Sequence, residues 1–278
     1  MAISVRDFER ICDYQACVRL QMEVWGFSAA DAVPEMHLLA MHHFGGVCIG
    51  AFDDELDGAM VGFVCGFSGW DGRRPFHHSH MLAVQPSYRG QRLGERLKWA
   101  QRDRALAQGI DWINWTFDPL QAPNANLNIN RLGAIVRKYR VNLYGESRSP
   151  LHGGVPTDRF EAEWLLRSER VEQAREGHLA ELPDWENLPR VNRVRNLSGF
   201  LACEDELELD RADDAVLIEL PRTINDLMAA DKDLALDWRM KLRRICQAYF
   251  ARSYSIRSVH RAGNSAFYRL EREDVPGE

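Results

Sequence analysis

A basic, glycine-bearing turn between an apolar segment and an amphipathic one is the part of this sequence best suited to bind a ligand. Apolar residues run from Met81 to Val84, Pro86 cannot continue a strand ladder, and leucine and alanine recur at helical spacing after Leu93. Backbone N–H groups in such a turn lack intrahelical acceptors and lie at the positive end of the helix dipole. The sequence therefore predicts a site for a phosphate, with a pyrophosphate as the expected ligand. Its residues are Arg89, Gly90, Gln91, Arg92, Leu93 and Gly94.

The Arg89–Gly94 segment resembles a signature of the GNAT superfamily of acyl-CoA-dependent N-acyltransferases: arginine or glutamine, two variable residues, glycine, one variable residue, then glycine or alanine. In that superfamily the loop amides hold the CoA pyrophosphate, so the resemblance implies acetyl-CoA or another acyl-CoA as co-substrate. Arg92 stands where the signature has its first glycine. A positive φ there costs a non-glycine residue roughly 1–2 kcal/mol, whereas a charge-assisted hydrogen bond from the guanidinium contributes about 1.5–3 kcal/mol. The substitution is compatible with binding; the alternative is an ordinary turn with solvated arginines.

The segment from Asn124 to Ala134 resembles the second signature of the superfamily, in which asparagine and alanine precede a helix that ends in leucine and glycine. In many members a tyrosine four residues before that glycine protonates the leaving CoA thiolate, and an asparagine eleven before it holds the pantetheine arm. Ile129 and Ala122 occupy these positions here. The usual acid is therefore missing. Asn124 or Asn126 has to substitute for the asparagine that holds the pantetheine arm.

The strand before the turn carries the candidate general bases, His78 and His80. Strand alternation would place both imidazoles on one face with Leu82 and Val84, beside the backbone expected to hold pantetheine. The resemblance favours His78, which falls roughly where some superfamily members carry a glutamate base. The alternative is that both are polar residues near a hairpin end. The backbone amides expected to align the pantetheine are those of Leu82, Ala83 and Val84, so that catalysis comes mainly from positioning and from polarising the thioester carbonyl.

Asp118 and Tyr139 complete the candidate catalytic residues. Asp118 ends a predicted strand, where it is either a second base or a cap of the following turn. Tyr139 and Tyr144 are candidate replacement acids, although buried or capping tyrosines are commoner.

Two other patterns suggest sites but also have simpler explanations. Arg159, Glu161 and Glu163 alternate along a predicted strand, a row that either orients an acceptor or forms a solvated face. His77, His78 and His80 suggest a metal site, because two imidazoles at strand spacing i, i+2 can meet one ion. No carboxylate or cysteine stands at ligand spacing from them, so no metal is expected.

The order of predicted elements is the GNAT order. It comprises strand 3–6, helices 7–25 and 34–43, strands 47–52, 60–67 and 77–84, the helix after residue 93, and strand 111–118. We therefore expect an α/β (α+β) fold of GNAT type, with a mixed central sheet flanked by helices. Further phrases, such as Trp-Thr-Phe-Asp-Pro-Leu, look like a subgroup of predicted acetyltransferases without an assigned substrate. The resemblance covers about residues 1–168.

The pattern changes after about residue 167. A charged helical stretch leads to a linker bracketed by prolines, and a hairpin (206–210 with 215–220), a helix (223–250) and strands 255–259 and 266–270 follow. The final strands either extend the first sheet or form a small accessory one. We expect an acyl-CoA-binding domain at 1–168, a helical linker at 169–189, and a C-terminal α/β extension at 190–278.

Composition narrows the class of partner and the compartment. A net charge of −6 disfavours nucleic acid and anionic membranes as partners. The six cysteines form no CxxC pair, and no signal-like or membrane-length apolar run is present, so a cytoplasmic protein is expected.

The expected function is transfer of an acetyl or other acyl group from acyl-CoA to an amine by direct attack. The acceptor is expected to be a small molecule or a peptide, and homodimerisation is left open. The alternative is a non-catalytic acyl-CoA-binding or regulatory module, which Arg92, Ile129 and Ala122 suggest because they depart from the family pattern.

Overall fold

The computed structural model describes residues 3–145, 155–179 and 185–273, and these fall into two compact units. The first unit holds residues 3–115 and 165–168, and the second holds the other described residues. Strand β5 passes from the first unit to the second after Trp115.

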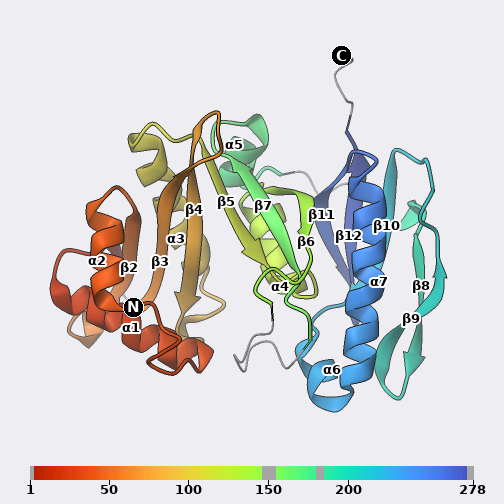
Figure 1. The fold of residues 1–278 in the computed structure, drawn as a ribbon, viewed down its shortest axis with the longest axis horizontal. Helices are drawn as coiled ribbons and strands as arrows, with labels where there is room; N and C mark the ends of the chain where they lie inside the picture. The colour runs from red at the N-terminus through yellow and green to blue at the C-terminus, as the bar shows by residue number, and fades with distance from the viewer. Residues whose placement is uncertain (1–2, 146–154, 180–184, 274–278) are drawn as a thin grey trace. The chain divides into compact units, whose positions relative to one another are not determined.

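The first unit is a sheet with helices on both faces (Figure 1). Its strands are β1 (Ile3–Asp7), β2 (Val47–Asp53), β3 (Ala59–Trp70), β4 (Pro75–Val84) and the first part of β5 (Trp112–Phe117). Its helices are α1 (Ile11–Trp25), α2 (Glu35–His43) and α3 (Leu93–Ala107). The strand order is β1-β2-β3-β4-β5, with antiparallel pairs up to β4 and a parallel β4–β5 pair. This mixed sheet flanked by helices confirms the predicted fold class.

Apolar residues alternate along the central strands and give each face its own core. Phe63 and Cys65 of β3 pack with α1 and α2 on one face. Val61 and Val64 pack on the other face with Leu93 and Leu97 of α3, which Figure 1 shows behind β3 and β4. The strand that leads to the predicted anion turn and the helix that follows it are thus fixed by one shared core.

The second unit contains an antiparallel sheet in the order β7-β6-β11-β12-β10 and a separate β8–β9 hairpin. Its strands are β6 (Ile135–Arg140), β7 (Arg159–Leu165), β8 (Asn192–Leu197), β9 (Phe200–Leu207), β10 (Ala215–Pro221), β11 (Tyr254–Ala262) and β12 (Ser265–Arg272). Its helices are α4 (Ala122–Ala125), α5 (Glu169–Glu176), α6 (Asn225–Ala230) and α7 (Lys232–Phe250). Trp238, Leu242, Ile245 and Tyr249 of α7 are buried, and α7 packs against β6, β9 and β11.

Two predictions for the C-terminal part are wrong. The segments 206–210 and 215–220 do not form a hairpin, because β9 pairs with β8 and β10 pairs with β12. The helix expected over 223–250 is interrupted at Asp231, which has an extended backbone and accepts a hydrogen bond from the Leu234 N–H at 2.9 Å. Asp231 thereby ends α6 and caps α7.

The last two strands extend a sheet rather than forming an accessory one. Ile256 of β11 pairs with Val136 of β6, which also pairs with β7. Residues from both sides of the predicted linker therefore share one sheet, and the two units do not coincide with the predicted boundaries at 168 and 190. Among the described helices, none has the length and apolar character that crossing a membrane requires.

Candidate functional site

The turn between β4 and α3 has the backbone conformation of an anion site. Pro86–Tyr88 forms a single 3-10 turn, and α3 begins at Leu93, whose side chain is buried in the core beneath the helix. Gly90 and Arg92 have positive φ angles of 80° and 57°. Among the described residues, no protein group accepts a hydrogen bond from the backbone N–H groups of residues 90–95, and the first bond of α3 runs from Arg96 N to Arg92 O at 3.0 Å. These donors are therefore available to a ligand.

Arg92 adopts the left-handed conformation that the signature glycine would adopt. Its guanidinium donates to the Glu95 carboxylate at 2.9 and 2.6 Å, while 62% of the Arg92 side chain stays exposed. Glu95 raises the pKa of Arg92 through this hydrogen bond. The charge of Arg92 thus offsets the Glu95 carboxylate, which would otherwise repel a phosphate at the start of α3.

The strands β4 and β5 part beside this turn. They pair at His77–Ile113 and His78–Asn114, and the described residues form no further β4–β5 pair toward the turn. The next residue on β4 is Ser79, which pairs with Gly66 of β3 but has no β5 partner, and the next residue on β5 is Trp115. One edge of β4 is therefore open from the middle of the strand to the turn.

The register of β4 with β3 shows which backbone groups face that open edge. Gln85 N donates to Val61 O at 2.9 Å, so alternation assigns the amide of Ala83 to the β3 ladder as well. Leu82 and Val84 then turn their backbone groups toward the open edge. Arg89 Nε reaches Val84 O from the turn at 3.3 Å. Of the three predicted pantetheine contacts, Leu82 and Val84 are the two with amides on the open side.

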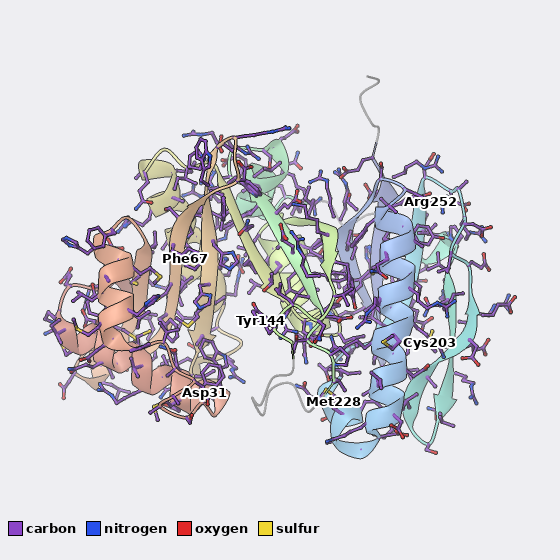
Figure 2. The ribbon with its side chains drawn as sticks, in the orientation of Figure 1. Asp31, Phe67, Tyr144, Cys203, Met228 and Arg252 are labelled. Carbon is purple, nitrogen blue, oxygen red and sulfur yellow. The ribbon has the colours of Figure 1, made fainter. Side chains whose placement is uncertain are left out.

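A bulge at His80 changes the faces of β4. Met81 lies opposite Cys65 and Ser79 lies opposite Gly66, so His80 is an additional residue that reverses the alternation. Its imidazole and that of His78, 6.2 Å apart, both contact the ring of Phe67, labelled in Figure 2.

The two histidines do not share a face with Leu82 and Val84, and that prediction is wrong. Leu82 and Val84 pack with α3, whereas the bulge leaves His80 on the side where Met81 packs with α1 and α2. The prediction failed because it assumed uninterrupted alternation along β4.

His78 is arranged to accept a proton. Its Nδ1 is 2.7 Å from Asn114 Oδ1, and because an amide oxygen only accepts, Nδ1 carries the proton and Nε2 is the basic nitrogen. The pKa of His80 is lowered by loss of hydration, then by the charges of His78 and His37, so His80 is neutral near pH 7.

A buried lysine lies where the strands part, and sequence reasoning did not select it. Lys98 of α3 donates from Nζ to Ser79 Oγ at 2.9 Å and to Gln101 Oε1 at 3.2 Å, and Nζ lies 3.6 Å from the centroid of the Trp115 ring. Burial lowers its pKa well below the ordinary value. Ser79 and Trp115 directly follow the last β4–β5 pair, so Lys98 lies at the base of the gap between these strands. The sequence feature that could have indicated its burial is that Lys98 directly follows Leu97, an apolar position of the predicted helix.

His77 faces α3 rather than the other two histidines. Its Nε2 accepts from Gln101 Nε2 at 3.0 Å, because the Gln101 oxygen is already bonded to Lys98. The three histidines therefore cannot converge on one ion. In the part of the chain that the structure describes, no group of three or more potential metal ligands is present.

The other candidate residues belong to the second unit. Asp118 Oδ1 accepts from Leu120 N at 2.8 Å, as in the capping alternative, and Oδ2 accepts from Arg239 at 2.8 Å. Asn126 begins a π-helical turn and accepts from Asn130 at 3.0 Å, while Asn124 is exposed on α4.

Tyr139 is held in a buried polar network. Its hydroxyl donates to Asp158 Oδ2 at 2.7 Å, and Arg243 donates to both oxygens of that carboxylate at 2.8 Å. Burial raises the pKa of Tyr139 far above its ordinary value, and the charge of Asp158 raises it further. The alternating row on β7 is also paired: Glu161 and Glu163 both lie opposite cations of β6.

Comparison with known proteins agrees with this geometry. Residues 14–127 match the family model described as the acetyltransferase (GNAT) family. No curated protein matches the chain.

Three solved structures illustrate the similarity. The NatC complex bound to Gag peptide and CoA has 16% identity and a TM-score of 0.49, covering 59% of this chain and 99% of that one. The ribosomal-protein-S18-alanine N-acetyltransferase from Escherichia coli has 16% identity and a TM-score of 0.47, covering 59% and 94%. An acetyltransferase of the GNAT family from Streptococcus pneumoniae has 15% identity and a TM-score of 0.47, covering 58% and 98%.

The matched segment includes β4, the turn Arg89–Gly94 and the whole of α3. It also includes the parted strands, His78 and the bulge residue His80. Residues 14–127, which contain the motif of that turn, are therefore similar to the acetyltransferase (GNAT) family.

Proposed function

We propose that the protein is an acyl-CoA-dependent N-acyltransferase that moves an acetyl or other acyl group to the amine of a small molecule or peptide. The observation that carries this proposal is the row of unpaired N–H groups at residues 90–95, next to the open edge of β4. A diphosphate fits the first feature, and an extended pantetheine arm fits the second. The family match supports the same chemistry.

In this proposal the turn and the strand edge hold the two parts of the co-substrate. The amides of Gly90–Gly94, with Arg89 and Arg92, bind the diphosphate. The backbone groups of Leu82 and Val84 bind the pantetheine as an added strand would. Asn124 and Asn126 remain proposed pantetheine contacts.

The reaction proposed is direct attack. The amine nitrogen attacks the thioester carbonyl carbon, the C–S bond breaks, and the CoA thiolate leaves. His78 Nε2 is the proposed proton acceptor, with neutral His80 beside it. The demand on this base depends on the acceptor: deprotonating a lysine-like amine at pH 7 costs about 4.6 kcal/mol, and an α-amine near pKa 8 costs about 1.4 kcal/mol.

We assign no general acid. The Tyr139 hydroxyl is committed to Asp158, and Asp118 is committed to Leu120 N and Arg239. The absence of the usual tyrosine, with Ile129 in its place, is the observation that keeps a non-catalytic acyl-CoA-binding module as the second candidate.

Calorimetry with CoA and acetyl-CoA, followed by thiol release against a panel of amines, tests the proposal. Gly90→Val should weaken CoA binding by at least about tenfold, because a β-branched residue disfavours positive φ. His78→Asn should slow thiol release and change CoA affinity less. Gly58→Val is the matched control, since Gly58 also has a positive φ, of 71°, and open space around it, but lies in the β2–β3 turn.

Each outcome separates the two candidates. CoA binding with thiol release supports the transferase, and binding without release from any amine supports the non-catalytic module. Absence of CoA binding would remove both.

We also propose a cytoplasmic setting. All six cysteines are free thiols, and all but Cys12 are buried. Free thiols are typical of reducing compartments. Homodimerisation stays a prediction, for which sedimentation of the full chain is the measurement.

A further inference from the structure

A buried arginine in the second unit has donors without acceptors. Only 2% of Arg239, on α7, is exposed to solvent. Its Nη2 donates to Asp118 Oδ2 at 2.8 Å, whereas Nε and Nη1 are buried and have no hydrogen-bond partner among the described residues. A guanidinium is always charged, and unsatisfied donors on a buried charge are strongly unfavourable. Such an arrangement indicates a place for an additional acceptor.

A second guanidinium lies at the same carboxylate. Arg159, at the start of β7, has its Nη1 3.7 Å from Asp118 Oδ2 and donates from Nη1 to the Asp158 carbonyl at 2.8 Å. Burial lowers the pKa of Arg159, and the charge of Arg239 also lowers it, so the two cations interact. The neighbouring Asp158 carboxylate is already bound by Arg243 through two hydrogen bonds.

Hydroxyl groups flank these cations. Tyr144, labelled in Figure 2, follows β6 and is 52% exposed, and its hydroxyl is 3.0 Å from Thr116 Oγ1. The Arg159 guanidinium lies over the Tyr144 ring, 5.4 Å from its centroid. Residues from β5, β7, α7 and the segment after β6 therefore meet at one place in the second unit.

We propose that Arg239 and Arg159 form a binding site for the carboxylate group of a small molecule. An anionic oxygen would accept from the Arg239 donors that lack partners. A carboxylate is favoured over a phosphate because Asp118 stays within the site, and its charge repels a dianion more than a monoanion. The Asp118 side chain, which both guanidinium groups approach, is 21% exposed.

The test uses the full chain with sodium acetate as the probe, compared with sodium chloride and sodium phosphate at equal ionic strength. Acetate should raise the melting temperature more than either salt, and calorimetry should give a dissociation constant. Arg239→Met and Arg159→Gln should abolish the difference between acetate and chloride. Asp118→Asn should act in the opposite direction and tighten acetate binding by about tenfold or more, since it removes a like charge.

Arg243→Gln is the matched control, because Arg243 is on the same helix but donates to Asp158 rather than to Asp118. It should lower the melting temperature without changing the acetate effect. If Arg239→Met does not fold, Arg159→Gln and Asp118→Asn still decide the question, through their opposite signs.

Three results would overturn the proposal. Equal stabilisation by acetate and chloride would show only charge screening, stronger stabilisation by phosphate would assign a different anion, and an unchanged affinity in Asp118→Asn would place acetate elsewhere. Neither acyl-CoA nor an amine is present, so these outcomes are separate from those for the transferase.

Discussion

Replacing Arg92 by glycine separates the strain of the turn from the contribution of its charge. Arg92 has a φ of 57°, where a non-glycine residue is disfavoured by roughly 1–2 kcal/mol. Its ion pair with Glu95 is largely exposed, at 62% for the arginine side chain, and such pairs contribute at most about 1 kcal/mol. The two terms nearly cancel, so Arg92→Gly should change the free energy of unfolding by less than about 1 kcal/mol.

Binding of CoA should respond much more strongly. The substitution removes a cation from the proposed diphosphate site and leaves Glu95 without its counter-charge. A charge-assisted hydrogen bond contributes about 1.5–3 kcal/mol, which corresponds to a loss of roughly 10- to 150-fold in affinity. Arg92→Lys retains the charge and the backbone conformation, and it should bind CoA within several-fold of the unmodified protein.

Calorimetric titration of CoA at two ionic strengths, with urea unfolding of the same variants, measures both effects. Arg92→Gly should lose affinity and part of the salt dependence, while Glu95→Gln in the same background should recover part of the loss. If Arg92→Gly bound CoA as tightly as the unmodified protein, the guanidinium would contribute nothing to binding. Tighter binding would show that the site favours a glycine backbone.

Three further predictions concern stability. Burial, Lys98 and His78 lower the pKa of His77 from 6.5 to about 3. The unfolded chain therefore takes up this proton first, and stability should fall by about 1.4 kcal/mol per unit as the pH drops below 6.5. His77→Gln should flatten that slope in urea unfolding; an unchanged slope would contradict a neutral His77. Burial lowers the pKa of Lys98, so stability should rise with pH up to about 10.5, and Lys98→Met should remove this rise in thermal unfolding. Asp231→Ala should cost about 0.5–2 kcal/mol through loss of the α7 cap, whereas Asp233→Ala should cost little; equal losses would contradict the cap.

The first 118 residues could be predicted closely because their elements alternate clearly between strand and helix periodicity. Every predicted strand and helix in that region is present, with ends shifted by a few residues. The strand β6 was missed because half of its residues, Ile-Val-Arg-Lys-Tyr-Arg, are charged, and β8 was missed because four of its six residues are Asn or Arg. The pairing of β9 and β10 depends on partners distant in sequence, which local patterns do not contain.

In the candidate site, too, local features could be predicted and features that depend on distant segments could not. The anion turn was predictable because glycines, arginines and a helix start are local features. The bulge at His80 was not, because one added residue is visible only in the register with β3. Lys98 and Arg239 were missed because solvated cations are the usual expectation for these residue types, and their burial is decided by packing of distant segments.

The central claim is that the amides of residues 90–95 receive the diphosphate of CoA. Titration of the protein with CoA and with pantetheine, which lacks the diphosphate, tests this most directly. If two or more charge-assisted hydrogen bonds form, CoA should bind at least about 100-fold more tightly than pantetheine, and Gly90→Val should reduce that ratio. Equal affinities for CoA and pantetheine would contradict the account.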